Sequence, residues 1–380
     1  MTISRRNFIQ LGAATSALAG FAAPHTFAAG IFEPSRVDQN DGVILLYSNE
    51  NAYGPSKVVA NAIMSAVASS NRYPRMQYPA LTEKIAATHQ AKPEQILLGC
   101  GSTEILRMAA CAFLGNGKRL IQASPTFEAM GAYARIVGAE VSSVPLTSTF
   151  AHDLDGMLAQ AGASAGLVYI CNPNNPTASL TPRKDIESFI SKLPASTLVV
   201  IDEAYHHFAG NSAMYASFID RPINDERVIV MRTFSKVYGL AGLRLGYAVA
   251  APAAIKRMAE YTTHDNINAF ATYASFAALD DTKGVSDAVH RNSNDRQEFF
   301  NQAMGRSLKP IDSHTNFVMM NTFHPAEDAI AHFRANNILI GRRFPPMETY
   351  IRVSLGLPEE MLAFWKTWDM LPYAGQLRHH

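Results

Sequence analysis

A lysine that is preceded by two hydroxyl side chains and followed by an arginine is the most distinctive chemical feature of this sequence. The segment reads TFSKVYGLAGLR from Thr233 to Arg244, and it holds Lys236 between an apolar stretch and a turn. A desolvated lysine loses its proton readily, and its neutral amine can then form a Schiff base with a carbonyl group. Thr233 and Ser235 can donate short hydrogen bonds to a phosphate, and the guanidinium of Arg244 can hold the same dianion. The segment therefore predicts an amine nucleophile beside a phosphate-binding site.

An aspartate and a tyrosine follow a second apolar stretch, and an asparagine-rich turn follows a third. Asp202 ends the apolar run Thr197–Asp202, and Tyr205 comes shortly after it. A carboxylate buried at a strand end needs a cationic partner such as a protonated pyridine nitrogen, although capping of a helix is an equally simple role. Tyr205, and Asn175 in the turn Cys171–Thr177, could both bind a phenolic oxygen on the same ring. These three side chains are candidate ligands of a planar aromatic cofactor.

Two further strand ends offer groups for the same cofactor. Gly101, Ser102 and Thr103 follow an apolar run and open a helical segment. Free N–H groups at a helix N-terminus bind phosphate, although an ordinary N-cap at Ser102 or Thr103 also explains these residues. Phe127 follows another apolar run, where its ring can stack on a planar cofactor or pack in the core.

Short apolar runs alternate with helix-like segments through most of the chain, and these elements must position the chemical groups. Four of the seven runs are followed directly by Gly, Pro, Ser or Asn, and the intervals between most runs are long enough for crossover helices. This pattern predicts an α/β fold with a mostly parallel central sheet and helices on both faces. The predicted strands are Gln95–Leu98, Arg119–Ala123, Glu140–Val144, Gly166–Cys171, Thr197–Asp202, Arg227–Arg232 and Leu245–Ala250.

The pattern changes near residue 280, which indicates a second domain. A helix-like segment, Asp280–Met304, precedes another α/β stretch with strands at Thr315–Met320 and Tyr350–Ser354. We therefore predict an N-terminal arm over residues 29–60, a large domain over 61–280 and a smaller α/β C-terminal domain over 281–380.

The composition excludes several functional classes. Of the 380 residues, 48% are hydrophobic and 17% are charged, which excludes an intrinsically disordered chain. Lys and Arg number 33 against 32 Asp and Glu, so no overall field favours nucleic acid or an anionic membrane surface. Three cysteines cannot all pair within one chain, so a disulfide scaffold is excluded. We also predict no metal site.

The first 28 residues have the features of an export signal. Arg5 and Arg6 precede an uncharged, Ala- and Gly-rich stretch up to Ala23, and Thr26-Phe27-Ala28 offers small residues to signal peptidase. The segment resembles a twin-arginine (Tat) signal peptide, and the Tat machinery exports folded proteins. We therefore predict cleavage near residue 28 and a periplasmic location. The stretch is too short and too rich in Ala and Gly for a membrane span, so we expect no stable membrane association. A cytosolic N-terminal helix is the alternative.

Taken together, the motifs resemble those of the fold-type I PLP-dependent aminotransferases (class I/II), and in particular the histidinol-phosphate aminotransferase family. The similarity extends from Leu46 to Leu355. It implies that Lys236 holds pyridoxal 5'-phosphate (PLP) as an internal aldimine and later moves a proton, and that Asp202 keeps the pyridine nitrogen protonated. It implies that Tyr205 and Asn175 bind the ring oxygen and that Phe127 stacks on the ring. The implied phosphate ligands are Gly101, Ser102, Thr103, Thr233, Ser235 and Arg244.

The resemblance also extends to substrate binding and assembly. Tyr73, in the Arg-Tyr-Pro element, would reach the PLP phosphate of a neighbouring subunit, which implies a homodimer. Arg352, in the strand Tyr350–Ser354, would clamp the α-carboxylate of an amino acid or 2-oxo acid. Asn49 and Tyr53 fall in the segment that lines the family's substrate pocket.

The sequence departs from the family pattern at several points. Ala178 replaces a turn glycine, which predicts a somewhat different local backbone. Arg342 and Arg343 lie near the family's phosphate-binding arginine, but Phe344–Met347 after them is not the usual Gly-rich run. The segments His206-His207 and Thr263-His264-Asp265-Asn266 are also unusual, and polar loop or supporting roles are the simplest interpretation of their histidines.

The alternatives for function concern the substrate and the reaction. Histidine biosynthesis is cytosolic, so a predicted export signal argues against that substrate. Besides an exported transaminase with a ping-pong cycle, we consider another PLP reaction on the same scaffold: a decarboxylase, an oxidase or a lyase. A protein that has lost catalysis and only binds a ligand is a third possibility. The presence of Lys236, Asp202 and Arg352 argues against the third.

Overall fold

The computed structural model describes residues 42–374. The predicted signal peptide and the beginning of the predicted N-terminal arm therefore lie outside the described residues. Among the residues that are described, no helix is both long enough and apolar enough to cross a membrane.

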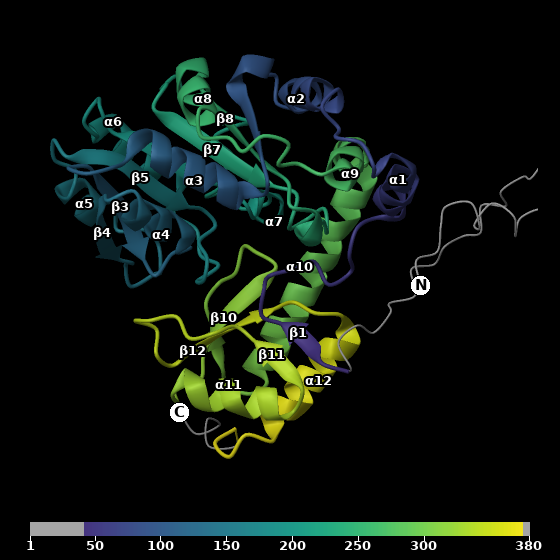
Figure 1. Cartoon of the computed structure of the whole chain (residues 1–380). Coiled ribbons are helices and arrows are strands. Elements are labelled where there is room, and N and C mark those ends of the chain that lie inside the picture. Colours follow the sequence, from purple (N-terminus) through teal and green to yellow (C-terminus); the bar gives the residue numbers. More distant parts are fainter. Residues whose placement is uncertain (1–41, 375–380) are drawn as a thin grey trace, which may run out of the picture. The chain divides into compact units, whose positions relative to one another are not determined.

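A seven-stranded sheet forms the frame of the larger part of the molecule (Figure 1). Its strand order is β2-β8-β7-β6-β5-β3-β4, and only β8 runs antiparallel to its neighbours. All seven predicted strands are present, with ends shifted by no more than one residue, so the predicted fold class is confirmed. Their bounds are β2 Ile96–Gly99, β3 Arg119–Ser124, β4 Glu140–Pro145, β5 Ala165–Cys171, β6 Leu198–Asp202, β7 Val228–Thr233 and β8 Gly246–Ala250.

Helices cover both faces of this sheet because its strands are apolar on both sides. In β5, Leu167 and Tyr169 pack into one hydrophobic core, whereas Val168 and Ile170 pack into the other. This alternation follows from the two-residue period of a strand. The first core receives α3 (Ser102–Phe113), α4 (Ala129–Ile136) and α8 (Pro252–Ala259). The second receives α1 (Lys57–Ala66), α2 (Gln77–Thr88), α5 (Leu154–Ala159), α6 (Arg183–Lys192) and α9 (Ala269–Asp280).

The C-terminal part has a hydrophobic core of its own. Its helices are α10 (Thr282–Met304), α11 (Ala326–Ala335) and α12 (Pro358–Asp369). Strand β10 (Phe317–Asn321) lies between β9 (Lys309–Pro310) and β12 (Tyr350–Ser354), antiparallel to both. Phe299, Phe333, Phe364 and Trp368 fill the core. The domain boundaries that we drew from the sequence remain a prediction.

The N-terminal segment joins this C-terminal part. Strand β1 (Ile44–Leu46) pairs in parallel with β11 (Ile338–Ile340), and Leu46 is buried in the C-terminal core. The residues that follow β1 are thereby held between the C-terminal part and the edge of the large sheet where β5, β6 and β7 end. This edge is where loop side chains from several strands can converge.

Candidate active site

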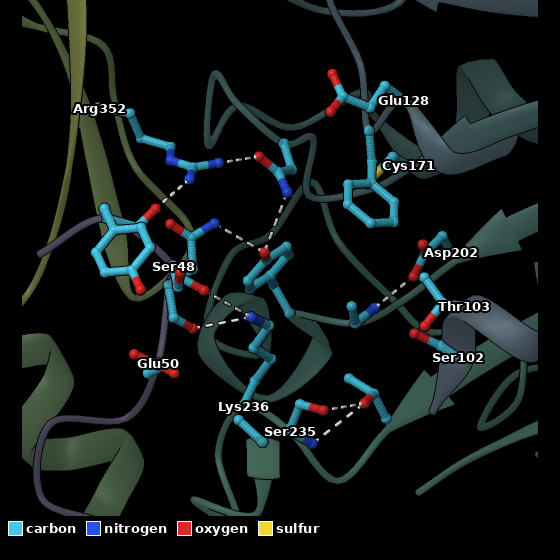
Figure 2. A pocket seen from close by; sticks show the side chains of 18 of the residues that line it. Ser48, Glu50, Ser102, Thr103, Glu128, Cys171, Asp202, Ser235, Lys236 and Arg352 are labelled. Carbon is cyan, nitrogen blue, oxygen red and sulfur yellow. Dashed lines mark hydrogen bonds between the residues drawn. The ribbon is translucent and has the colours of Figure 1, made fainter. Parts of the chain in front are cut away.

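One pocket, of about 560 Å³, lies where these strand ends meet the segment after β1 (Figure 2). It brings together side chains that are far apart in the sequence. The predicted site residues that line it are Asn49, Ser102, Thr103, Phe127, Asn175, Asp202, Tyr205, Thr233, Ser235, Lys236, Arg244 and Arg352.

Asp202 is the buried carboxylate of the pocket. It ends β6, and its Oδ1 accepts a hydrogen bond from the N–H of Ala204 at 3.0 Å. Its Oδ2 accepts one from the hydroxyl of Tyr169 at 2.9 Å. Burial raises the pKa of Asp202 to about 6, against the opposing effect of the Tyr169 hydrogen bond and of Lys236. Such a carboxylate is well suited to a cationic ring nitrogen, which would compensate for its desolvation.

Lys236 is a buried lysine whose pKa is lowered. Its Nζ donates to the backbone carbonyl of Asn49 at 2.9 Å and points toward that of Ser48 at 3.4 Å. Burial, together with the positive charges of Arg352 and Arg244, lowers the pKa of Lys236 to about 8. A substantial fraction of the amine is therefore neutral near pH 7 to 8, as a nucleophile or a proton acceptor requires.

The hydroxyl of Tyr205 is hydrogen-bonded to two side-chain amides, and one of these amides also binds Arg352. Its hydroxyl accepts hydrogen bonds from Asn49 Nδ2 at 3.0 Å and from Asn175 Nδ2 at 3.4 Å. Burial raises its pKa, so Tyr205 stays protonated. The Oδ1 of Asn175 in turn accepts from Arg352 Nη1 at 2.7 Å (Figure 2). Arg352 and Tyr205 are thus linked through a single amide.

The other end of the pocket is built from short donors. The guanidinium of Arg244 donates to Ser235 Oγ at 3.3 Å and to Thr103 Oγ1 at 3.1 Å. Gly101 has φ +75°, and a Cβ atom there would collide with the guanidinium of Arg244. Helix α3 begins at Ser102, so its free N–H groups face the same space. This end of the pocket can hold a phosphate dianion.

The residues therefore fit PLP. Thr103, Ser235 and Arg244 can hold its phosphate, Asp202 can pair with its ring nitrogen, and Lys236 can supply an amine that is partly neutral near pH 8. Within residues 42–374, no group of three or more His, Cys, Asp and Glu side chains is arranged to hold a metal ion.

Three predicted site residues do not line the pocket. Gly101 lies behind it, against Arg244. Tyr53 lies in a separate small pocket, where its hydroxyl donates to Asp295 at 3.1 Å. Tyr73 is 70% exposed, with the guanidinium of Arg75 over its ring. The roles of these residues remain predictions.

Several residues that the fold brings to the site were not predicted from the sequence. Tyr169 lies inside an apolar strand, where the sequence does not distinguish it from its neighbours, but its side chain faces the same side of the sheet as Asp202. The backbone carbonyls of Ser48 and Asn49 accept hydrogen bonds from Lys236 Nζ, and no sequence pattern predicts such a backbone contact. The other lining residues that we did not predict are Tyr47, Glu50, Thr126, Glu128, Cys171, Ala204, Ala241, Gly242 and Phe344. Arg342, which we noted near the family's phosphate-binding arginine, also lines the pocket.

The departures from the family pattern have structural explanations. Ala178 has φ +63° and adopts the left-handed conformation that favours glycine. The expectation that its local backbone differs from that of the family remains a prediction. His206 and His207 lie in α7 (His206–Ala209), and burial lowers the pKa of His207 to about 3. Their rings contact the hydroxyls of Tyr215 and Tyr238, so both act as neutral supports.

The fold and the pocket define a PLP-dependent enzyme of fold type I, and comparison with known proteins specifies its family. Residues 41–363 match the model of the family "Aminotransferase class I and II", and the chain belongs to this family. It is a PLP-dependent aminotransferase.

Individual relatives agree with this assignment. The histidinol-phosphate aminotransferase of Staphylococcus carnosus (strain TM300) is 35% identical over 85% of this chain and 90% of its own. The structure of a putative histidinol-phosphate aminotransferase from Erwinia carotovora atroseptica has a TM-score of 0.82 and 33% identity, over 87% of this chain and 97% of its own. That of the Sinorhizobium meliloti histidinol-phosphate aminotransferase, solved with pyridoxal-5'-phosphate, has a TM-score of 0.81 and 28% identity, covering 88% and 91%.

Proposed function

We propose that this aminotransferase takes an α-amino acid and a 2-oxo acid in turn, with the α-carboxylate of each bound by Arg352. The observation that carries the proposal is an unused donor. The Nη1 and Nη2 atoms of Arg352 bond to Asn175 and to the carbonyl of Tyr47, whereas its buried Nε has no partner among the described residues. A buried guanidinium with a free donor favours an anionic ligand.

The charge of Arg352 persists in this environment. Burial lowers its pKa to about 10, which still leaves it protonated at neutral pH. Its guanidinium lies 5.5 Å from the ring centre of Phe317 and 4.7 Å from that of Phe344. These two rings fix the plane of the guanidinium, so a carboxylate would bind in one orientation, beside Lys236.

The chain's own residues divide the chemical work. Bound PLP supplies an electron sink that weakens the bonds at the substrate's Cα. Asp202 would hold a proton on the ring nitrogen, and the hydroxyl of Tyr205 with the amide of Asn175 would bind the ring oxygen. The Nζ of Lys236, with its pKa lowered to about 8, takes up the proton from Cα and returns it.

A screen of half-reactions tests the proposal. The holoenzyme is mixed with each amino acid and with histidinol phosphate, while the absorbance of the bound cofactor and the formation of its pyridoxamine form are followed. We expect α-amino acids to react and Arg352→Gln to raise KM for all of them. Release of CO2 or hydrogen peroxide would assign another PLP reaction instead, and reaction with histidinol phosphate alone would contradict the substrate class.

We further propose that the enzyme is a homodimer in which each Tyr73 enters the partner's site. Tyr73 does not line the pocket of its own chain, and it belongs to a run of exposed apolar side chains that are otherwise unexplained. The others in this run are Val58, Met64, Val67 and Met76. A two-fold interface over these residues would remove them from water. Light scattering should give twice the mass of the chain, and a monomer would contradict the proposal.

We also propose export through the Tat pathway to the periplasm. The support is the sequence alone: Arg5-Arg6, the Ala- and Gly-rich stretch and Thr26-Phe27-Ala28. A Tat route would carry the folded protein with PLP already bound. Replacement of both arginines by lysine should keep the full-length protein in the cytosol, whereas the wild type should be found, shortened, in the periplasm. If both stay cytosolic at full length, the proposal is wrong.

A further inference from the structure

The hydroxyl of Tyr205 receives two hydrogen bonds and keeps its own proton free to donate. It accepts from Asn49 Nδ2 at 3.0 Å and from Asn175 Nδ2 at 3.4 Å. A tyrosine hydroxyl accepts with its lone pairs and donates one proton. Within residues 42–374 no acceptor lies within reach of that proton, so it is left for a group bound in the pocket.

Strand β12 holds each of the two amides in one orientation. Arg352 Nη1 donates to Asn175 Oδ1 at 2.7 Å, which turns the Nδ2 of Asn175 toward Tyr205. Ser354 Oγ donates to Asn49 Oδ1 at 3.3 Å, which turns the Nδ2 of Asn49 toward the same hydroxyl. Arg352 and Ser354 are two positions apart in the strand, so their side chains leave the same face of the sheet.

The backbone of Asn49 is fixed, so the orientation of its amide is the freedom that remains. Asn49 is 2% exposed and has φ +55°, in the left-handed region. Its N–H donates to Ser354 Oγ at 2.8 Å, and its carbonyl accepts from Asn316 Nδ2 at 3.0 Å. Ser354 thus accepts from the backbone of Asn49 and donates to its side chain. A reversed amide would leave the buried proton of Ser354 without an acceptor, which is costly.

We propose that Ser354 is a positioning residue that directs the proton of Tyr205 into the pocket. With Ser354 in place, both amides present N–H groups to Tyr205, whose proton is then donated to the ring oxygen of PLP. Without the serine hydroxyl, the amide of Asn49 can turn its oxygen toward Tyr205 and accept that proton itself. This inference rests on the proposed function, in which Tyr205 binds the ring oxygen. It adds a residue that does not line the pocket and yet controls this bond.

The absorption spectrum of the holoenzyme, recorded against pH, measures this bond. The ring oxygen of bound PLP shares a proton with the nitrogen that Lys236 contributes, so a donor to the ring oxygen lowers the pKa at which the spectrum changes. Ser354→Ala should raise this spectral midpoint by about 0.5–1 unit, part of the roughly 1–2 units that a hydrogen bond to a charged oxygen contributes. Ser354→Thr keeps the hydroxyl and should keep the wild-type midpoint.

A matched control is present in the same part of the molecule. Ser313 and Ser354 are both 3% exposed, but Ser313 Oγ donates to the carbonyl of Phe317 at 2.6 Å and not to a side-chain amide. Ser313→Ala should therefore leave the spectral midpoint unchanged.

A double-mutant cycle tests whether Ser354 acts through Asn49. Asn49→Gly removes the amide at a position whose positive φ suits glycine, and it should raise the midpoint because Tyr205 loses one of its two donors. Ser354→Ala should then add nothing in the Asn49→Gly background, because both changes act through one amide.

Three results would overturn the inference. They are an unchanged midpoint in Ser354→Ala, an equal rise in Ser313→Ala, and a further rise when Ser354→Ala is combined with Asn49→Gly. If Ser354→Ala does not fold, an unchanged midpoint in Asn49→Gly overturns the inference in its place. A failure of the proposed function gives a different result. Tyr205→Phe should raise the midpoint more than any of these variants, and if it has no effect, the role of Tyr205 at the ring oxygen is wrong.

Discussion

Tyr169 supports the negative charge on Asp202, and its replacement by phenylalanine tests this role. The Tyr169 hydroxyl donates to Asp202 Oδ2 at 2.9 Å, and both side chains are buried. Phenylalanine keeps the ring in the core and removes only the oxygen. The carboxylate then retains the N–H of Ala204 as its remaining donor within the described residues.

The size and direction of the effect follow from this geometry. A hydrogen bond to a charged group contributes about 1.5–3 kcal/mol, and one pKa unit corresponds to about 1.4 kcal/mol. Because the bond favours the ionised form, its loss should raise the pKa of Asp202 by about 1–2 units from its present value. That present value, about 6, is already above the ordinary 3.8.

In the cofactor-free protein, the raised pKa of Asp202 makes its contribution to stability depend on pH. Between pH 3.8 and about 6 the folded protein retains a proton on Asp202 that the unfolded chain has released. The stability conferred by the protonated form is therefore fully present below the unfolded pKa and is lost as the pH rises through the folded pKa. In Tyr169→Phe this loss should extend to higher pH.

Infrared titration of the cofactor-free protein measures the shift directly. The band of the protonated Asp202 carboxyl is identified by subtracting the spectrum of Asp202→Asn, and its midpoint is compared between the wild type and Tyr169→Phe. As a second readout, PLP should bind about 10- to 100-fold more weakly to Tyr169→Phe below neutral pH, and the difference should diminish as the pH rises.

A second buried tyrosine provides the control. The hydroxyl of Tyr215 lies 3.2 Å from His206 Nδ1, and burial lowers the pKa of His206 to about 2. That histidine does not titrate between pH 5 and pH 9, so Tyr215→Phe should leave the midpoint of Asp202 unchanged. If Tyr169→Phe also titrates with the wild-type midpoint, the reasoning about the Tyr169–Asp202 bond is refuted.

Three further predictions concern the cofactor site. Lys236→Ala should abolish turnover while the fold persists, and borohydride reduction of the wild type should fix PLP on Lys236; label recovered on another lysine would contradict this. Because the pKa of Lys236 is lowered to about 8, the rate at which the cofactor-free protein captures PLP should rise with pH and level off above about 8, as stopped-flow absorbance would show. A Cβ atom at Gly246 would lie 2.5 Å from the N atom of Ser102, so Gly246→Ala should displace the phosphate turn, weaken PLP binding in an equilibrium titration and lower the stability by about 1–3 kcal/mol.

Much of the fold was predictable because its signals are local. A strand such as Ala165–Cys171, buried on both faces, must be apolar along its whole length, and the chain must turn where it ends. The same rule indicated much of the candidate site, since Asn175 and Lys236 follow β5 and β7, and Asp202 ends β6, the strand between them. Polar side chains at the ends of buried strands are costly unless they have a partner, so they indicate a functional site.

The sequence by itself thus predicted many of the side chains that line the pocket, and the tertiary structure decided which of them contact one another. Tyr169 reads as core, and only the packing of β5 beside β6 gives it Asp202 as a partner. Lys236 owes its lowered pKa to its burial and to Arg352, which comes from a distant strand. An ion pair between Glu128 and Arg342 joins residues more than 200 positions apart. Residue type and local pattern are properties of a short segment, whereas burial and charge–charge contact depend on neighbours that only the folded chain supplies.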